Sequence, residues 1–133
     1  MSSTIWKGRL AEAETMTSLI AQGYEPYLPV FGNGPCDLVA IHPTYRQVIR
    51  IEVKFTSSQR RPSRWDVSLK QTRPNRTGVV TKMFNSFQCD VLAVYVEPLD
   101  RVLYFDASSL EGRNSMVVKD DPERYLVPIL EQG

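Results

Sequence analysis

The sequence has little cysteine, one histidine and no long apolar run. Its two cysteines, Cys36 and Cys89, lie far apart and outside any C-x-x-C pair, so a zinc site is not supported. No apolar stretch approaches the roughly 18 residues of a membrane span, and residues 1–10 lack the apolar core of a signal peptide. With 42% hydrophobic residues, we expect one globular domain over 1–133 in the cytoplasm, without disulfide or membrane segment.

The chain also has almost no net charge, +1 from 16 basic and 15 acidic side chains. These charges are unevenly distributed. Residues 54–82 contain eight lysines and arginines against one aspartate, a local charge of +7, which leaves −6 for the rest. A basic segment of this kind is typical of a polyanion-binding protein, although a solvated basic loop has the same composition.

The spacing of apolar residues predicts a mixed α/β fold built around one sheet. A helix is expected over residues 7–22, closed by Gly23 as its C-terminal cap, because apolar residues recur there at helical spacing. Residues 77–87 fit either a helix or a loop. The apolar helix positions are Leu10, Ala13, Met16, Leu19 and Ile20, and strands are expected at 36–41, 48–55, 65–70, 90–96 and 101–105.

The predicted strand over 48–55 has one apolar face and one charged face, because successive side chains alternate. The charged face carries Arg50, Glu52 and Lys54. Charges in the middle of a core strand are costly unless they are paired or hold a metal. An exposed polar face of a half-covered strand is the simpler explanation, so the E-x-K pattern is a weak indication by itself.

Asp37 strengthens the indication because it opens the preceding strand, directly after a turn. Antiparallel pairing through a short hairpin brings it next to Glu52. Two adjacent carboxylates repel each other, and a hard divalent cation such as Mg²⁺ resolves the repulsion. Lys54 then lies where it can orient a water molecule and stabilise charge that develops on a phosphate.

A third carboxylate is expected from the first helix. Glu12 falls inside the arc of apolar helix positions, whereas Glu14 falls just outside it. We therefore predict Glu12 as the site residue and Glu14 as the solvated one.

These residues together resemble the PD-(D/E)xK nuclease superfamily, whose fold is a restriction-endonuclease-like core with a mixed central sheet flanked by helices. The elements that match are Glu12 on the opening helix, Gly34-Pro35-Cys36-Asp37 before the first core strand and Ile51-Glu52-Val53-Lys54 on the next. Within the superfamily the chain is most similar to the group I intron homing endonucleases of cyanobacterial, bacterial and phage type. Cys36 between the proline and Asp37 departs from the usual motif. Archaeal-type Holliday junction resolvases and short repair or restriction nucleases share the same core.

The resemblance implies a metal-dependent endodeoxyribonuclease that hydrolyses phosphodiester bonds. It implies that Asp37, Glu52 and the carbonyl of Val53 hold Mg²⁺, with Mn²⁺ as a substitute, and that Glu12 completes the site directly or through water. Lys54 positions the attacking water. It also implies a bacterial, archaeal or phage-encoded protein. A non-catalytic DNA-binding module is the alternative from another class.

The basic segment begins at the strand that carries Glu52 and Lys54, so its side chains are candidates for DNA contacts. Trp65 is expected in the core rather than stacked on a base. A single site cuts one strand, so double-strand cleavage predicts a homo-oligomer, a dimer or a tetramer. The candidate DNA-binding residues are Arg60, Arg61, Arg64, Lys70, Arg73 and Arg76.

Overall fold

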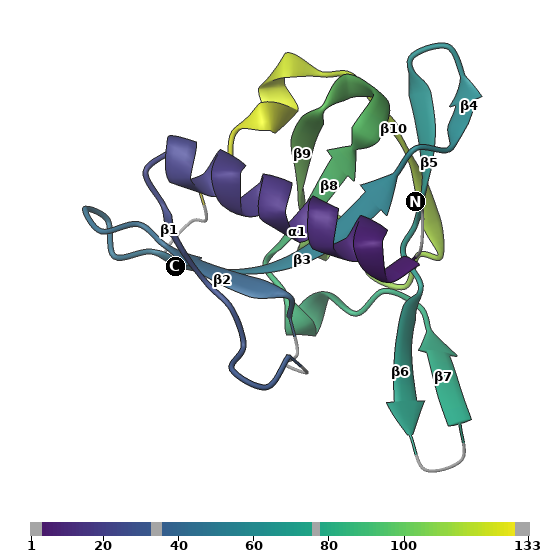
Figure 1. Ribbon diagram of the computed structural model, residues 1–133, viewed down its shortest axis with the longest axis horizontal. Coiled ribbons are helices and arrows are strands. Elements are labelled where there is room, and N and C mark those ends of the chain that lie inside the picture. The colour runs from purple at the N-terminus through teal and green to yellow at the C-terminus, as the bar shows by residue number, and fades with distance from the viewer. Residues whose placement is uncertain (1–3, 33–35, 76–77, 130–133) are drawn as a thin grey trace.

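The computed structural model describes residues 4–32, 36–75 and 78–129, with the side chains of 71–75, 78–82 and 87 left out (Figure 1). Helix α1 (Thr4–Ala21) runs across the molecule. It ends as predicted, because Gly23 adopts φ +89° and its N–H donates to the carbonyl of Ile20 at 3.0 Å. Among the described residues, no helix combines the length and apolarity that crossing a bilayer requires.

A five-stranded mixed sheet forms the centre of the fold, in the order β1-β2-β3-β8-β9. Strands β3 and β8 pair in parallel and the other neighbours pair antiparallel. This arrangement confirms the predicted fold class. The strands are β1 (Glu25–Tyr27), β2 (Leu38–Ile41), β3 (Val48–Thr56), β8 (Val91–Val96) and β9 (Arg101–Asp106).

Helix α1 covers one face of the central sheet. Ile49 and Ile51 of β3 are completely buried beneath it, and Val53 and Phe55 pack against the same apolar cluster. The apolar face predicted for this strand is therefore the helix-facing one.

The opposite face is covered by a second, three-stranded sheet in the order β10-β5-β4, rather than by another α-helix. Trp65 and Val67 of β5 are buried against Leu92 and Val94 of β8, so the expected core position of Trp65 is confirmed. The small sheet consists of β4 (Gln59–Arg61), β5 (Arg64–Ser68) and β10 (Ser115–Lys119), and short 3₁₀ turns η1 (Ser86–Gln88), η2 (Glu97–Leu99), η3 (Ala107–Leu110) and η4 (Pro122–Tyr125) complete the described structure.

Two sequence-based expectations were wrong. Residues 77–87, expected to be a helix or a loop, contain β7 (Gly78–Lys82), which pairs antiparallel with β6 (Gln71–Asn75) to form a projecting hairpin. The buried stripe of α1 consists of Ala11, Thr15 and Leu19. Leu10, Ala13 and Ile20, which were expected on the buried side, are exposed.

Candidate active site

Strand β3 presents Glu52 and Lys54 on the face turned away from α1. The Lys54 ammonium lies 3.8 Å from Glu52 Oε1, and the two side chains are only 21% and 15% exposed. Lys54 Nζ also donates a hydrogen bond to the carbonyl of Lys70 at 3.1 Å. These two contacts hold the ammonium group beside Glu52.

Asp37 lies at the edge of the sheet beside this pair. The pairing of β2 with β3 ends at Leu38 and Ile51, so β3 continues past its neighbour. Asp37 closes the end of the ladder, because its N–H donates to the carbonyl of Ile51 at 3.0 Å and its Oδ2 accepts the N–H of Val53 at 2.7 Å. The hairpin register thus brings Asp37 to the strand segment that carries Glu52, as the sequence predicts.

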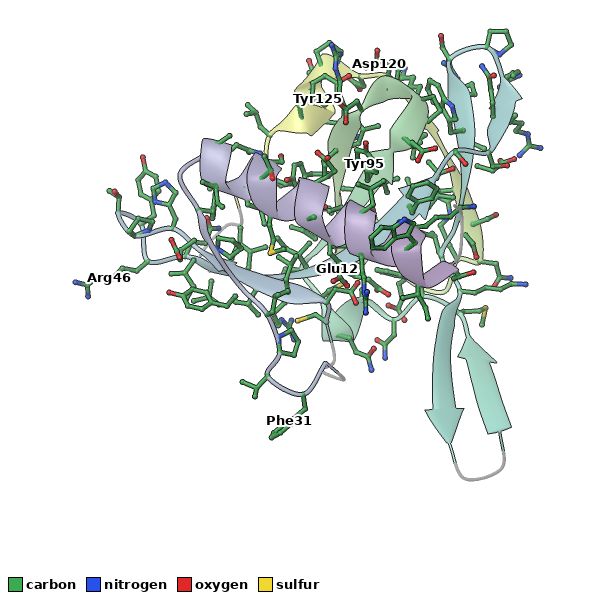
Figure 2. All side chains as sticks on the ribbon, in the orientation of Figure 1. Glu12, Phe31, Arg46, Tyr95, Asp120 and Tyr125 are labelled. Carbon is green, nitrogen blue, oxygen red and sulfur yellow. The ribbon has the colours of Figure 1, made fainter. Side chains whose placement is uncertain are left out.

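Glu12 reaches the same edge from the helix layer, and it lies on α1 above the strands (Figure 2). Burial raises the pKa of its carboxyl group, and the charge of Asp37 raises this pKa further. Glu12 and Asp37 therefore interact electrostatically. Glu14, expected to be solvated, is also partly buried.

The donor chemistry of this edge fits a hard divalent cation. Its groups are carboxylate and carbonyl oxygens, and the unfavourable interaction between Glu12 and Asp37 is of the kind that a bound cation relieves. Across the part of the chain that the structure describes, no three His, Cys, Asp or Glu side chains converge closely enough to form a metal site by themselves. A cation here would therefore also need backbone or water oxygens, which is usual for Mg²⁺.

Two residues that were not predicted as site residues, Cys89 and Asp90, contact the strand that carries Glu52. The Cys89 thiol lies 4.0 Å from Glu52 Oε2, and burial, followed by the charge of Glu52, raises the pKa of this thiol to about 12. The neutral thiol can donate a weak hydrogen bond to the carboxylate. Asp90 accepts the backbone N–H of Arg50 at 2.9 Å and pairs with its guanidinium at 3.1 Å, which ties β3 to the start of β8.

A groove of about 630 Å³ opens along β3 beyond Ile51, where β2 no longer pairs with it. It lies between the start of α1 and β5, and its lining includes Lys7, Lys54 and Ser58. Lys7 contributes a second ammonium group, which sequence reasoning did not select. Its Nζ lies 5.6 Å from the centre of the Phe55 ring.

The predicted DNA-binding residues are divided between two hairpins. Arg60, Arg61 and Arg64 lie on or beside the β4–β5 hairpin, which extends toward the top of Figure 1, whereas β6–β7 extends toward the bottom. Arg60 pairs with Asp66 at 3.3 Å. Lys70 is exposed between the two hairpins. The side chain of Arg73 and all of Arg76 lie outside the described part of the chain.

Comparison with protein families decides the classification. A family model described as PD-(D/E)XK endonuclease matches residues 2–126. The chain belongs to this family. Family membership confirms the expected fold and the enzyme class, an endonuclease, while no curated protein matches the chain significantly.

Two solved structures share the fold of this PD-(D/E)XK endonuclease. The bacterial homing endonuclease I-Ssp6803I is 20% identical, with a TM-score of 0.73 over 92% of this chain and 82% of the other. The Holliday junction resolvase Hjc of the archaeal hyperthermophile Archaeoglobus fulgidus is 18% identical, with a TM-score of 0.52 over 90% of this chain and 87% of the other. The structural similarity thus covers the same two groups that the sequence resembles.

Proposed function

We propose that this PD-(D/E)XK endonuclease is a Mg²⁺-dependent enzyme that hydrolyses phosphodiester bonds in duplex DNA, as a homing endonuclease does. The observation that supports this most directly is the arrangement along β3. Asp37 is bonded to the backbone at Val53, between Glu52 and Lys54, and Lys54 lies 3.8 Å from Glu52. Carboxylates and an ammonium group held this closely are the groups that phosphodiester hydrolysis requires.

In this proposal Asp37, Glu52 and the carbonyl of Val53 hold the cation, and Glu12 completes the site directly or through water. Mg²⁺, with Mn²⁺ as a substitute, supplies positive charge that stabilises the phosphate in the transition state. Lys54 positions the attacking water, and its contact with the Lys70 carbonyl keeps the ammonium group oriented before DNA binds.

The groove beside β3 is the proposed path of the DNA strand that is cut. Lys7 and Lys54 line it, and both can neutralise phosphate charge. The hairpins β4–β5 and β6–β7 extend in opposite directions from this region (Figure 1). A duplex that runs along this side of the molecule would meet Arg60, Arg61, Arg64 and Lys70. Arg73 and Arg76 are also proposed as DNA contacts.

Cleavage of both strands requires two active sites, so we propose that the enzyme acts as a homodimer or homotetramer. Helix α1 offers an apolar surface for self-association, because Ile5, Trp6 and Ile20 are 69%, 55% and 61% exposed. An enzyme that acts on DNA in a bacterial, archaeal or phage-infected cell would work in the cytoplasm.

The test compares the wild-type protein with Lys54→Ala on supercoiled plasmid, a linear duplex carrying candidate intron-insertion sites and a four-way junction, each with Mg²⁺ or EDTA. We expect wild type to cut duplex DNA only with Mg²⁺ and the variant not to cut. Preferred cleavage of the junction would indicate a resolvase instead. Salt-sensitive binding without cleavage on all substrates would indicate a DNA-binding module.

A further inference from the structure

The connection between β1 and β2 carries two apolar side chains that the monomer does not bury. Val30 is 90% exposed and Phe31 is 93% exposed. Phe31 points away from the body of the protein at the tip of this connection (Figure 2). Tyr27 and Leu28 beside them are also about half exposed, 52% each, so this connection carries a run of exposed apolar side chains, and such a patch marks an interaction site.

The tip has a defined backbone shape. The N–H of Gly32 donates to the carbonyl of Pro29 at 3.3 Å, and Gly32 adopts φ +75°, a conformation that favours glycine. Proline fixes its own φ at the start of the turn. The turn thus holds Phe31 outward before any partner binds, which lowers the entropic cost of insertion.

The tip is also close in the chain to the proposed active site, because Asp37 follows Phe31 by six residues. The β1–β2 connection and the β6–β7 hairpin both extend below the sheet in Figure 1, and the strand ends that carry the site lie above them. A duplex bound between these two projections would face both the tip and the proposed active site.

We propose that Phe31, supported by Val30, is a wedge that inserts between two stacked bases of the DNA and kinks it at the active site. This inference rests on the proposed function. Proteins that kink DNA insert apolar side chains, phenylalanine among them, between base steps. A contact with a second copy is the competing explanation, because Tyr27 and Leu28 would add to such an interface, and the sedimentation measurement below tests it.

The experiment measures unwinding of a closed circular plasmid by topoisomerase relaxation, with all proteins in a Lys54→Ala background to prevent cleavage. We expect the parent to shift the distribution of topoisomers and Phe31→Ala to abolish the shift at saturating protein. Phe31→Trp should restore it. Phe31→Ala should also weaken plasmid binding by about 5-fold or more, because base stacking is lost.

Tyr45→Ala is the matched control, since Tyr45 is an exposed aromatic residue, 68% accessible, at the opposite end of β2. It should unwind the plasmid as the parent does. If Phe31→Ala still unwinds fully while wild type cleaves DNA, the wedge is wrong and the proposed function stands. If Phe31→Ala instead lowers the sedimentation coefficient without DNA, the tip contacts a second copy and the wedge is also wrong. A wild-type protein that neither binds nor cuts DNA overturns both proposals.

Discussion

The carboxylate of Asp37 accepts the backbone N–H of Val53 at 2.7 Å, across the gap where β2 has ended and β3 continues. Asp37, one proposed cation ligand, is therefore hydrogen-bonded to Val53, whose carbonyl is a second proposed ligand. Asp37 thus has a structural role in closing the strand ladder and a proposed chemical role in holding the cation, and substitutions can separate the two.

Asp37→Asn should keep the fold and lose the activity. The amide oxygen can still accept the Val53 N–H, so we expect the free energy of unfolding to change by less than about 1 kcal/mol. The lost charge should lower the cleavage rate by about 100-fold or more. Thermal unfolding and plasmid nicking measure the two effects. Asp37→Ala, which removes the acceptor, should cost a further 1–3 kcal/mol or so; an Asn variant that cuts at the wild-type rate would contradict the metal-ligand role.

Mg²⁺ should stabilise the folded protein through these carboxylates. At about ten times its dissociation constant, the cation adds about 1.4 kcal/mol to the free energy of unfolding, a shift of about 3–5 °C for a chain of this size. Glu52→Gln should abolish the shift, which differential scanning fluorimetry with Mg²⁺ or EDTA measures. Glu25→Gln, an exposed carboxylate on β1, is the control and should respond as wild type does. An undiminished shift in Glu52→Gln would place the cation elsewhere.

Lys70 should affect DNA affinity and not the chemical step. Its carbonyl, which no side-chain substitution removes, holds Lys54, whereas its exposed side chain is free to contact a phosphate. Lys70→Ala should keep the cleavage rate at saturating DNA and reduce the slope of log affinity against log salt by about 0.9. Arg46→Asn is the control for lost positive charge, since asparagine tolerates the φ of +52° there. A fall in the saturating rate of Lys70→Ala would show that its side chain acts in the site.

The Arg50–Asp90 pair should make the free energy of unfolding depend on pH in the acidic range. Burial raises the pKa of Asp90, but the hydrogen bonds from Arg50 and its charge outweigh burial and hold this pKa below its usual 3.8. Stability from a lowered pKa is present above pH 3.8 and is lost as the pH falls through the folded-state value. Asp90→Asn should therefore cost about 1 kcal/mol at pH 7, a modest value because Arg50 is partly exposed. Urea unfolding of both proteins at pH 7 and pH 3 measures this difference, which should narrow at the lower pH.

The strand that carries the site could be read from the sequence, because alternation separates Ile49 and Ile51 from Glu52 and Lys54 without knowledge of the fold. The short connection between the two strands also predicted the antiparallel pairing that brings Asp37 to β3. The parallel pairing with β8 could not, since Glu52 and Cys89 are far apart in sequence and nothing local relates them. For the same reason the support from Cys89 and Asp90 was missed.

The buried face of α1 was predicted only in part: Leu19 is buried as expected and Met16 packs against the core, but Ala11 and Thr15 were missed. Ala11 and Thr15 lie against the sheet, where small side chains let the helix approach closely. The Thr15 hydroxyl donates a hydrogen bond to the carbonyl of Ala11 at 2.8 Å. Leu10 and Ile20 lie outside this stripe and are exposed. The hairpin of β6 and β7 was missed because β6, with Pro74, is polar throughout and lacks the alternation that identifies a strand.

Strand β3 is held by β2 up to Ile51 and by β8 from Ile51 onward, whereas the β6–β7 hairpin and the Phe31 tip project from the body. Changes in these two projections can accumulate with little effect on the central strand, whereas β5 is buried against the central sheet through Trp65 and Val67. In the proposed function, this arrangement separates the groups that cut DNA from the groups that hold it. A lineage carrying this fold can exchange one target for another by altering its projections while inheriting the same chemistry.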